Sequence, residues 1–228
     1  MIDVIIIGSG GLARECHELL MDMVRTAPGL EQVYHFRGFV RWEGERVSPR
    51  GAHPLLGDAA SFSIGVRDMF VIGLAEPEMR KAAYESFKAR GASFLTLTHP
   101  WAAISPEAEV GEGNIFQRGS TVFCDSVIGN GNYFSSSMSL AHDVTVGDFN
   151  IVGPAALVLG QCSIGNGNVI GAQSVLLPRA KMGHGNSVMP GSIVYKGCGN
   201  GCVMAGNPAL RTGSVERAAA FEYPDEAL

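Results

Sequence analysis

Apolar side chains recur at every sixth position over most of the second half of the chain. From Ile104 to Val194, all sixteen such positions hold an aliphatic residue, Met or Phe. Neither an α-helix, with 3.6 residues per turn, nor a strand with alternating faces has this period. A hexapeptide repeat is typical of a parallel β-helix, so we predict that these side chains point inward and form its core.

The position two residues before each inward side chain supports the same fold. It is small or polar at every repeat except Met138 and Val144. Five of these positions are asparagines spaced by eighteen residues: Asn114, Asn132, Asn150, Asn168 and Asn186. Three hexapeptides therefore form one coil of triangular cross-section, and the asparagines should stack in one column. At eighteen residues per coil, the ninety-one residues from Ile104 to Val194 give about five coils, and about 4.8 Å between stacked strands gives a height on the order of 25 Å.

The first hundred residues follow a different pattern, in which strands alternate with helices. Strands are expected at Val4–Ile7, near Val33–Val40, at Leu55–Leu56, at Met69–Ile72 and at Ser93–Leu97, with helices after Gly10 and between Glu76 and Arg90. We predict a Rossmann-like α/β subdomain over residues 1–98, a β-helix domain over 99–211 and a tail over 212–228. The tail contains a candidate short helix at Val215–Phe221.

A glycine-rich turn joins the first predicted strand to the first predicted helix. The segment from Gly8 to Ala13 fits G-x-G-x-x-A, whose glycines let a phosphate approach backbone N–H groups at a helix N-terminus. NAD binding also calls for an acid at the end of the second strand, where this chain has Arg41-Trp42. Three interpretations stay open: a nucleotide-sugar site, an NAD site and a tight turn with a structural role.

His142 is the candidate catalytic side chain of the repeat region. It follows the inward Leu140 by two residues, at or near a corner, and precedes Asp143, a carboxylate placed to orient its imidazole. The other histidine of the repeats, His184, lies two coils plus one face away, so the two cannot stack. The alternative for His142 is a solvated corner residue without a catalytic role.

Composition narrows the classes further. The formal net charge of −5 argues against nucleic acid as a partner. The N-terminal apolar run is short and lacks a preceding basic region, and no apolar stretch approaches the length of a membrane span. The five cysteines match no metal-site spacing well. We expect a cytoplasmic protein with reduced thiols, no metal and no membrane partner.

Several short motifs, taken in order, resemble one family throughout residues 2 to 211. They are Gly8-Ser9-Gly10-Gly11, Gly38-Phe39-Val40, Leu56-Gly57-Asp58, Ile72-Gly73 with Arg80, His99-Pro100, Ala141-His142-Asp143, Val146-Gly147-Asp148-Phe149 and Gly206-Asn207-Pro208-Ala209. The chain resembles the sugar O-acyltransferases of the sialic acid O-acetyltransferase type. That family also includes bacterial N-acetyltransferases for nucleotide-linked amino sugars.

The resemblance implies a left-handed β-helix and a homotrimer with active sites between neighbouring β-helices. It also implies acetyl-CoA as the donor, His142 as general base, Asp143 as the residue that orients it, and the Gly160 N–H as a contact of the thioester oxygen. CoA phosphates need a local basic patch, for which the late cations are candidates, although an ordinary solvated face is the alternative. These cations are Arg179, Lys181, Lys196 and Arg211.

Two positions depart from the family pattern. Ile151 stands where relatives commonly carry a second histidine that engages the acyl donor, and Arg41-Trp42 replaces acids. We expect the acceptor to contact Gly8, Gly10, Gly11 and Arg41. The expected activity is acetyl-CoA-dependent acetylation of an amino or hydroxyl group on a sugar, nucleotide-linked, for surface glycans. Two other classes stay open: a non-catalytic nucleotide-sugar binding or scaffold protein, and a γ-type carbonic anhydrase, which needs three zinc-binding histidines.

Overall fold

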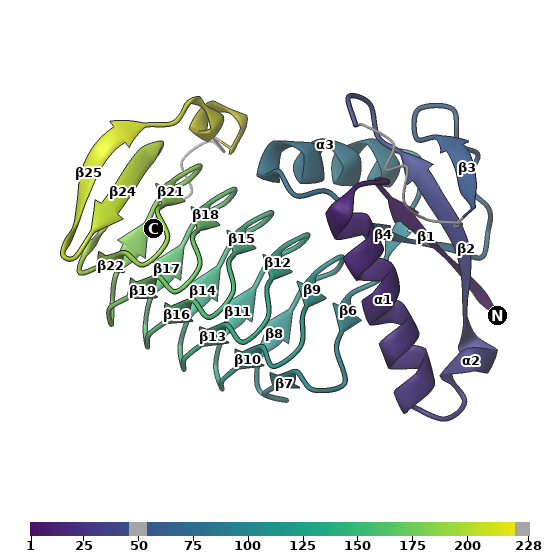
Figure 1. Cartoon of the computed structure of the whole chain (residues 1–228), viewed down its shortest axis with the longest axis horizontal. Helices are drawn as coiled ribbons and strands as arrows, with labels where there is room; N and C mark the ends of the chain where they lie inside the picture. Colours follow the sequence, from purple (N-terminus) through teal and green to yellow (C-terminus); the bar gives the residue numbers. More distant parts are fainter. Residues whose placement is uncertain (46–53, 222–228) are drawn as a thin grey trace.

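The computed structural model describes residues 1–45 and 54–221. Figure 1 shows an α/β part that carries the N-terminus beside a β-helix whose coils stack toward a C-terminal hairpin. The α/β part contains β1 (Ile2–Ile7), α1 (Gly11–Thr26), α2 (Leu30–Val33), β2 (Tyr34–Arg41), β3 (Leu55–Asp58), β4 (Asp68–Ile72), α3 (Pro77–Lys88) and β5 (Ser93–Phe94). Its strands form a parallel sheet in the order β3-β2-β1-β4-β5.

The central strand β1 separates two apolar layers. Val4 and Ile6 pack in a cluster with α1 and with outward residues of the β-helix, whereas Ile5 and Ile7 pack in a cluster with α3. All four side chains have no exposed surface. Burial on both faces explains why this strand is a continuous apolar run rather than an alternating one.

The β-helix consists of two-residue strands, one on each face of each coil. They are β6 (Leu97–Thr98), β7 (Ala103–Ile104), β8 (Glu109–Val110), β9 (Ile115–Phe116), β10 (Thr121–Val122), β11 (Val127–Ile128), β12 (Tyr133–Phe134), β13 (Ser139–Leu140), β14 (Thr145–Val146), β15 (Ile151–Val152), β16 (Leu157–Val158), β17 (Ser163–Ile164), β18 (Val169–Ile170), β19 (Val175–Leu176), β20 (Lys181–Met182), β21 (Ser187–Val188), β22 (Ile193–Val194) and β23 (Gly197–Cys198). Strands eighteen residues apart pair in parallel and form three faces. The predicted hexapeptide β-helix is confirmed.

The sixth-position residues form its core. From Phe116 to Val194 every one of them is buried, while Ile104 and Val110 at the first coil are half-buried. The two exceptions in the small column, Met138 and Val144, are also fully buried. Met138 fits because the residues one coil before and after it in its column are small, Ser120 and Ala156.

The asparagine column is a continuous hydrogen-bonded ladder. In each successive pair, the backbone N–H of one asparagine donates to the side-chain oxygen of the asparagine one coil earlier, at 2.7–2.9 Å. Each side-chain amide nitrogen donates to the same oxygen at 2.9–3.0 Å. The last coil is two residues shorter, and the Cys202 N–H ends the ladder on Asn186 at 2.7 Å.

One expected strand is in fact two. We predicted a single strand over Ser93–Leu97, but β5 belongs to the N-terminal sheet and β6 to the β-helix. The hydrogen-bond partners change between them, because the Leu95 N–H donates to Phe70 and the Leu97 N–H donates to Asn114. A continuous apolar pattern does not reveal this change of partner.

The C-terminal segment covers the end of the β-helix and returns toward α3 (Figure 1). β24 (Cys202–Gly206) and β25 (Ala209–Ser214) form an antiparallel hairpin, followed by the 3₁₀ helix η1 (Glu216–Phe221) at the position of the predicted short helix. Phe221 is fully buried 6.5 Å from the Phe149 ring, in space that a side chain on Gly167 would fill. The predicted tail beyond residue 221 lies outside the described residues.

The ladder generates a stability prediction. Asn150→Ala removes the side-chain oxygen that accepts the backbone N–H and the side-chain amide of Asn168 at this fully buried position, while the Asn132 side-chain oxygen keeps the residue-150 backbone N–H. Because each buried polar group without a partner costs about 1–3 kcal/mol, we expect the free energy of unfolding to fall by about 3 kcal/mol. Thr145→Ala, on the exposed side of β14, should change it by less than about 0.5 kcal/mol. Equal losses in the two variants, measured by denaturant unfolding, would contradict the role of the ladder.

Candidate active site

His142 and Asp143 form a hydrogen-bonded pair at a corner between β13 and β14. Asp143 adopts a left-handed backbone conformation, with φ of 58°, that turns the chain from one face to the next. Its Oδ2 lies 2.7 Å from His142 Nδ1, and both side chains are about half exposed. If the Nδ1–H donates to the carboxylate, Nε2 keeps its lone pair and is available as a base.

Gly160 lies one coil beyond His142 in the same column. A Cβ at Gly160 would lie 2.8 Å from both Cε1 and Nε2 of His142, so the imidazole ring leans over this glycine. The Gly160 carbonyl accepts a hydrogen bond from the Arg179 backbone N–H at 3.0 Å. Its own N–H has no acceptor within residues 1–45 and 54–221. The structure therefore places an imidazole nitrogen close to a glycine whose N–H is free for a ligand.

The coil before His142 carries an acidic group. Glu107, Cys124 and Asp125 place their ligand atoms within 4.8 Å of one another, and within the described part of the chain this is the group that could hold a metal ion. Partial desolvation and the Asp125 carboxylate, which accepts the S–H, raise the pKa of the Cys124 thiol. Cys124 therefore stays a neutral thiol at pH 7.

The structure brings the four late cations to the same end of the β-helix. Arg179 is on the His142 corner, where its Nε donates to the Gln161 side chain at 2.9 Å. The Lys181 N–H donates to the Lys196 carbonyl at 2.9 Å. Arg211, from β25, lies close enough to Cys198 for its charge to favour a lower pKa of that thiol. Cys198 is on β23, which pairs with β20, the strand that contains Lys181.

The three glycines of the turn differ in what they allow. Gly8 has φ of 112°, and a Cβ there would lie 2.8 Å from the Gly73 carbonyl, so the fold itself requires a glycine. Gly10 precedes α1 without a side-chain cap. A Cβ on Gly11 would have no atom of the described residues within 4 Å. The turn lies at the carboxyl end of β1, beside the change of strand order between β1 and β4, where such sheets bind ligands.

Arg41 is already paired. Its Nε donates to Asp58 Oδ1 at 2.7 Å, and its Nη2 lies 2.6 Å from the same oxygen, on an exposed surface. The residue that does reach the turn is Glu45, whose Oε2 accepts the Ser9 N–H at 2.9 Å. Sequence reasoning looked for an acid at the end of β2 and did not consider one four residues later.

Ile151 lies away from the His142 corner. It is on the outer side of β15, beside Tyr133 of β12, and packs against the apolar cluster under α1. His184 is also structural, because its Nδ1 accepts the Asn166 N–H at 2.9 Å along another corner. An apolar residue at position 151 thus packs in the interface between the β-helix and α1.

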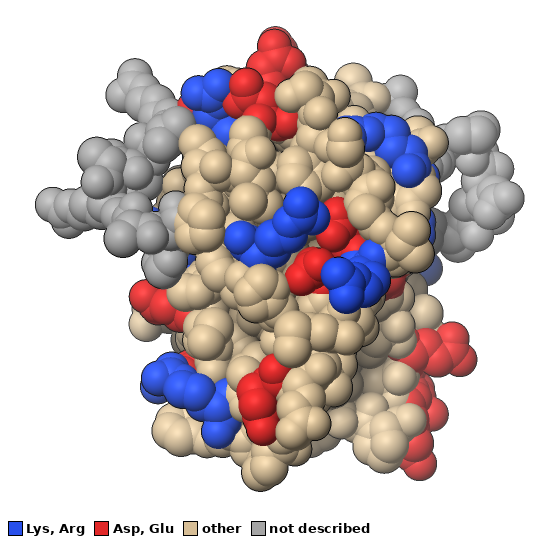
Figure 2. Space-filling view, turned by 90° about the vertical axis from the view of Figure 1, so that its right-hand side faces the viewer, with Lys and Arg blue, Asp and Glu red and all other residues tan. Residues whose placement is uncertain are grey.

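Surface charge is mixed at the end of the molecule that carries the N-terminal sheet. Figure 2 shows basic and acidic side chains interspersed among uncharged residues, with no continuous basic surface on this face. Such a face offers no extended site for a nucleic-acid backbone. Within the described residues, no helix is both long and apolar enough to cross a membrane.

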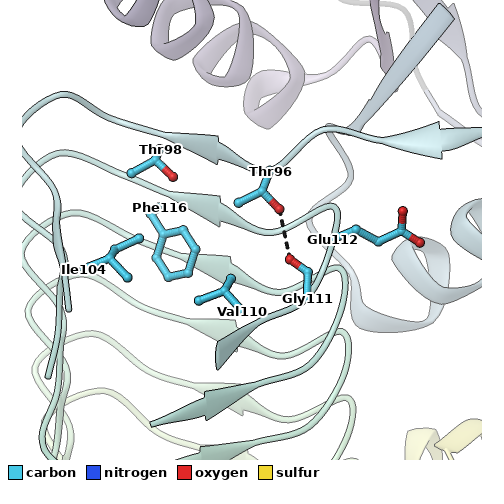
Figure 3. Close-up of a pocket in the computed structure, with 7 residues that line it drawn as sticks. All are labelled: Thr96, Thr98, Ile104, Val110, Gly111, Glu112 and Phe116. Carbon is cyan, nitrogen blue, oxygen red and sulfur yellow. Dashed lines mark hydrogen bonds between the residues drawn. The ribbon is translucent and has the colours of Figure 1, made fainter. Parts of the chain in front are cut away.

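Two cavities lie outside the His142 corner. One, of about 540 Å³, opens at the first coil and is lined by Thr96, Thr98, Ile104, Val110, Gly111, Glu112 and Phe116. Figure 3 shows the Glu112 carboxylate turned away from the other lining side chains, and it bonds Tyr84 instead. This cavity therefore has an apolar floor and no acid or base facing into it.

The second cavity, of about 530 Å³, separates α1 from the β-helix. Its lining is mainly polar: Glu15, Glu18, Leu19, Asp22, His99, Gln117, Arg118, Tyr133, Ser135 and Ser136. The buried His99 is held by the Trp101 N–H on Nδ1 and lies 3.4 Å from Asp22. The Tyr133 hydroxyl donates to Glu15 at 3.1 Å. These groups are satisfied by one another.

Comparison with solved structures shows several that match nearly the whole chain. The acetyltransferase domain of PglB from Neisseria gonorrhoeae, in complex with acetyl coenzyme A, has a TM-score of 0.81 at 21% identity and covers 92% of this chain and 98% of that one. PerB from Caulobacter crescentus, in complex with CoA and GDP-perosamine, has a TM-score of 0.80 at 23% identity and covers 92% and 97%. WeeI from Acinetobacter baumannii has a TM-score of 0.78 at 22% identity and covers 92% and 100%.

These similarities establish the fold. The chain has a left-handed parallel β-helix preceded by an α/β subdomain, as predicted. No protein-family model and no curated protein sequence matches the chain. The site is therefore assigned on its own geometry.

The contact between Gly160 and His142 yields a prediction. Gly160→Ala introduces a methyl group 2.8 Å from the ring, so the imidazole must turn away and lose its hydrogen bond to Asp143. We expect the ¹⁵N and ¹H imidazole signals of His142 to change in NMR spectra of the variant. Gly199→Ala, which has no neighbour within 4 Å, should leave them unchanged. Unaltered signals in Gly160→Ala would show that the ring does not depend on this glycine.

Proposed function

We propose that the protein is an acetyl-CoA-dependent acetyltransferase acting on an amino or hydroxyl group of a nucleotide-linked sugar. The observation that carries the proposal is the His142–Asp143 pair over Gly160. It combines a base, a residue that orients it and an open N–H at one corner. Acyl transfer to an amine or hydroxyl needs these groups: one takes a proton, and another receives negative charge on the carbonyl oxygen.

In the proposed reaction, His142 Nε2 accepts the proton of the acceptor's amino or hydroxyl group as that group bonds to the acetyl carbon. Asp143 holds the ring through Nδ1 and stabilises the imidazolium that forms. The Gly160 N–H donates to the carbonyl oxygen as negative charge develops on it. When the carbon–sulfur bond breaks, His142 returns the proton to the CoA sulfur and the enzyme is regenerated.

The donor is assigned to the C-terminal end of the His142 corner. A side chain on Gly160 would fill the space beside the imidazole, so the glycine is suited to the close approach of a thioester. Arg179, Lys181, Lys196 and Arg211 lie further along the β-helix and would bind the CoA phosphates. No metal takes part in these steps.

The acceptor is assigned to the glycine turn, which lies on a different side of the chain. α1 packs against the face that contains β12, whereas His142 stands on the opposite corner, so one chain does not bring acceptor and base together. A homotrimer would place one chain's corner next to a neighbour's turn. The exposed apolar residues Phe123 and Val127, close to this corner, support such a contact. We place the enzyme in the cytoplasm, in keeping with its five free cysteines and a role in surface glycan synthesis.

The base is tested by His142→Ala. Loss of general-base catalysis should lower kcat by roughly 10²–10⁴-fold in a thiol-release assay with acetyl-CoA and a panel of nucleotide sugars. Asp143→Asn should lower kcat by a smaller factor, because it keeps the base and removes only the carboxylate that orients the imidazole and stabilises its charged form. His35→Ala, an exposed histidine paired with Asp3, is the control and should keep full activity. Wild-type turnover by His142→Ala would overturn the mechanism, and no thiol release by the wild type would favour a binding or scaffold protein.

The donor site is tested by Arg179→Glu. Reversing one charge near the CoA phosphates should weaken CoA binding at least about tenfold, since a hydrogen bond to a charged group contributes about 1.5–3 kcal/mol. Isothermal titration calorimetry with CoA provides the measurement. Arg67→Glu, an exposed site on the N-terminal subdomain, should not change the affinity. An unchanged CoA affinity in Arg179→Glu would remove this residue from the donor site.

A further inference from the structure

The Glu45 carboxylate lies on the glycine turn, where the proposed reaction gives it no part. Its Oε2 accepts hydrogen bonds from the Ser9 N–H at 2.9 Å and the Trp42 N–H at 3.4 Å. Its Oε1 would lie 3.3 Å from a Cβ on Gly10. The segment after β2 thus folds back and fixes a carboxylate over the turn that follows β1.

This carboxylate has unused acceptor capacity. An ionised carboxylate offers about four lone-pair positions, and only Oε2 receives donors from the residues the structure describes. The Ser9 hydroxyl, on the same turn, is buried and has no hydrogen-bond partner among residues 1–45 and 54–221. Buried polar groups in proteins are normally hydrogen-bonded. A ligand hydroxyl at this turn could donate a hydrogen bond to Glu45 Oε1 and could also be a partner for the Ser9 hydroxyl.

The next two residues favour a different ligand group. Among the residues the structure describes, no atom lies within 4 Å of a Cβ on Gly11, and none caps the N-terminus of the sixteen-residue helix α1, whose first turn contains no acid. Its free N–H groups and helix dipole attract an anion. Glu45 repels a phosphate from the position above Gly10. The turn therefore separates a site for a hydroxyl at Gly10 from a site for phosphate at Gly11.

We propose that Glu45 binds the ribose 2′-hydroxyl of a ribonucleotide whose phosphates lie over Gly11 and the N-terminus of α1. In parallel nucleotide-binding sheets, an acid at the end of the second strand has this role. Here the acid stands four residues beyond β2, and the turn of the chain at Trp42–Glu45 returns it to the equivalent place. The inference rests on the proposed function and narrows its acceptors to ribonucleoside diphosphate sugars, which excludes deoxythymidine-linked ones.

A second explanation makes the opposite prediction. If Glu45 only takes the place of a ligand phosphate at the Ser9 N–H, every nucleotide must displace it. Removing the carboxylate would then tighten the binding of ribo- and deoxyribonucleotides alike. The ratio of the two affinities therefore separates the explanations better than either affinity alone.

The experiment is calorimetric titration of the whole chain, without acetyl-CoA, using GDP, 2′-deoxy-GDP, UDP and 2′-deoxy-UDP. The wild type should bind the ribonucleotide of at least one base about tenfold more tightly than its deoxy form, the worth of one hydrogen bond to a charged acceptor. Glu45→Ala should bring this ratio close to one. Glu43→Ala, an exposed carboxylate two residues earlier, should keep the wild-type ratio. Thermal melting confirms that both variants are folded.

The proposal is overturned by a wild-type ratio close to one, by a ratio that Glu45→Ala leaves unchanged, by tighter ribonucleotide binding in that variant, or by no binding of either ribonucleotide. The wild-type ratio is decisive even if the variant does not fold. Selective ribonucleotide binding without thiol release would support this inference and overturn the proposed reaction. Thiol release without a preference for ribonucleotides over deoxyribonucleotides would support the proposed reaction and overturn the inference about Glu45.

Discussion

A buried guanidinium joins the two parts of this protein, and the position of the N-terminal sheet against the β-helix depends on it. Arg80, on α3, has no exposed surface and donates at 2.7–2.8 Å to the carbonyls of Gly131, Ile72 and Leu74, with a longer contact to Asn132. Desolvation lowers its pKa to about 10, so it is still charged at pH 7. All of its partners are main-chain oxygens at the end of β4 and at a corner of the β-helix. Shortening this side chain would leave several carbonyls unpaired and loosen the sheet from the coils.

The geometry of the coil explains how the His142–Gly160 corner arises. Because stacked residues are eighteen apart, His142 and Gly160 are neighbours although they are distant in sequence. Left-handed backbone conformations recur in that corner at Asp143, Gln161 and Arg179, with φ between 58° and 67°. Each keeps the turn tight and displays its side chain. The stacked coils therefore hold the side chain of His142 against Gly160 on a rigid scaffold, and no long loop is needed to position them.

The parts of the structure that sequence reasoning found are those with a period. The hexad rule located the core, and counting by eighteen placed Gly160 under His142 correctly. Arg80 was recognised only as part of a motif, because an arginine on a helix is ordinarily exposed and only the folded chain shows its carbonyl partners. Glu45 was missed for a related reason: its contact with Ser9 is made by a loop whose path no local pattern encodes.

The C-terminal hairpin has a consequence for how copies of this molecule meet. A stack of parallel coils ends in unpaired backbone groups, and such an edge is a template on which another chain can continue the stack into a fibre. Here the longest face ends in β25, which runs antiparallel to β24, so a further coil could not continue the parallel stacking of this face. Assembly along the axis is thus discouraged at this end, and association is left to the sides of the β-helix. The hairpin therefore caps the β-helix, and a chain that lacked it would expose a strand edge on which further chains could stack.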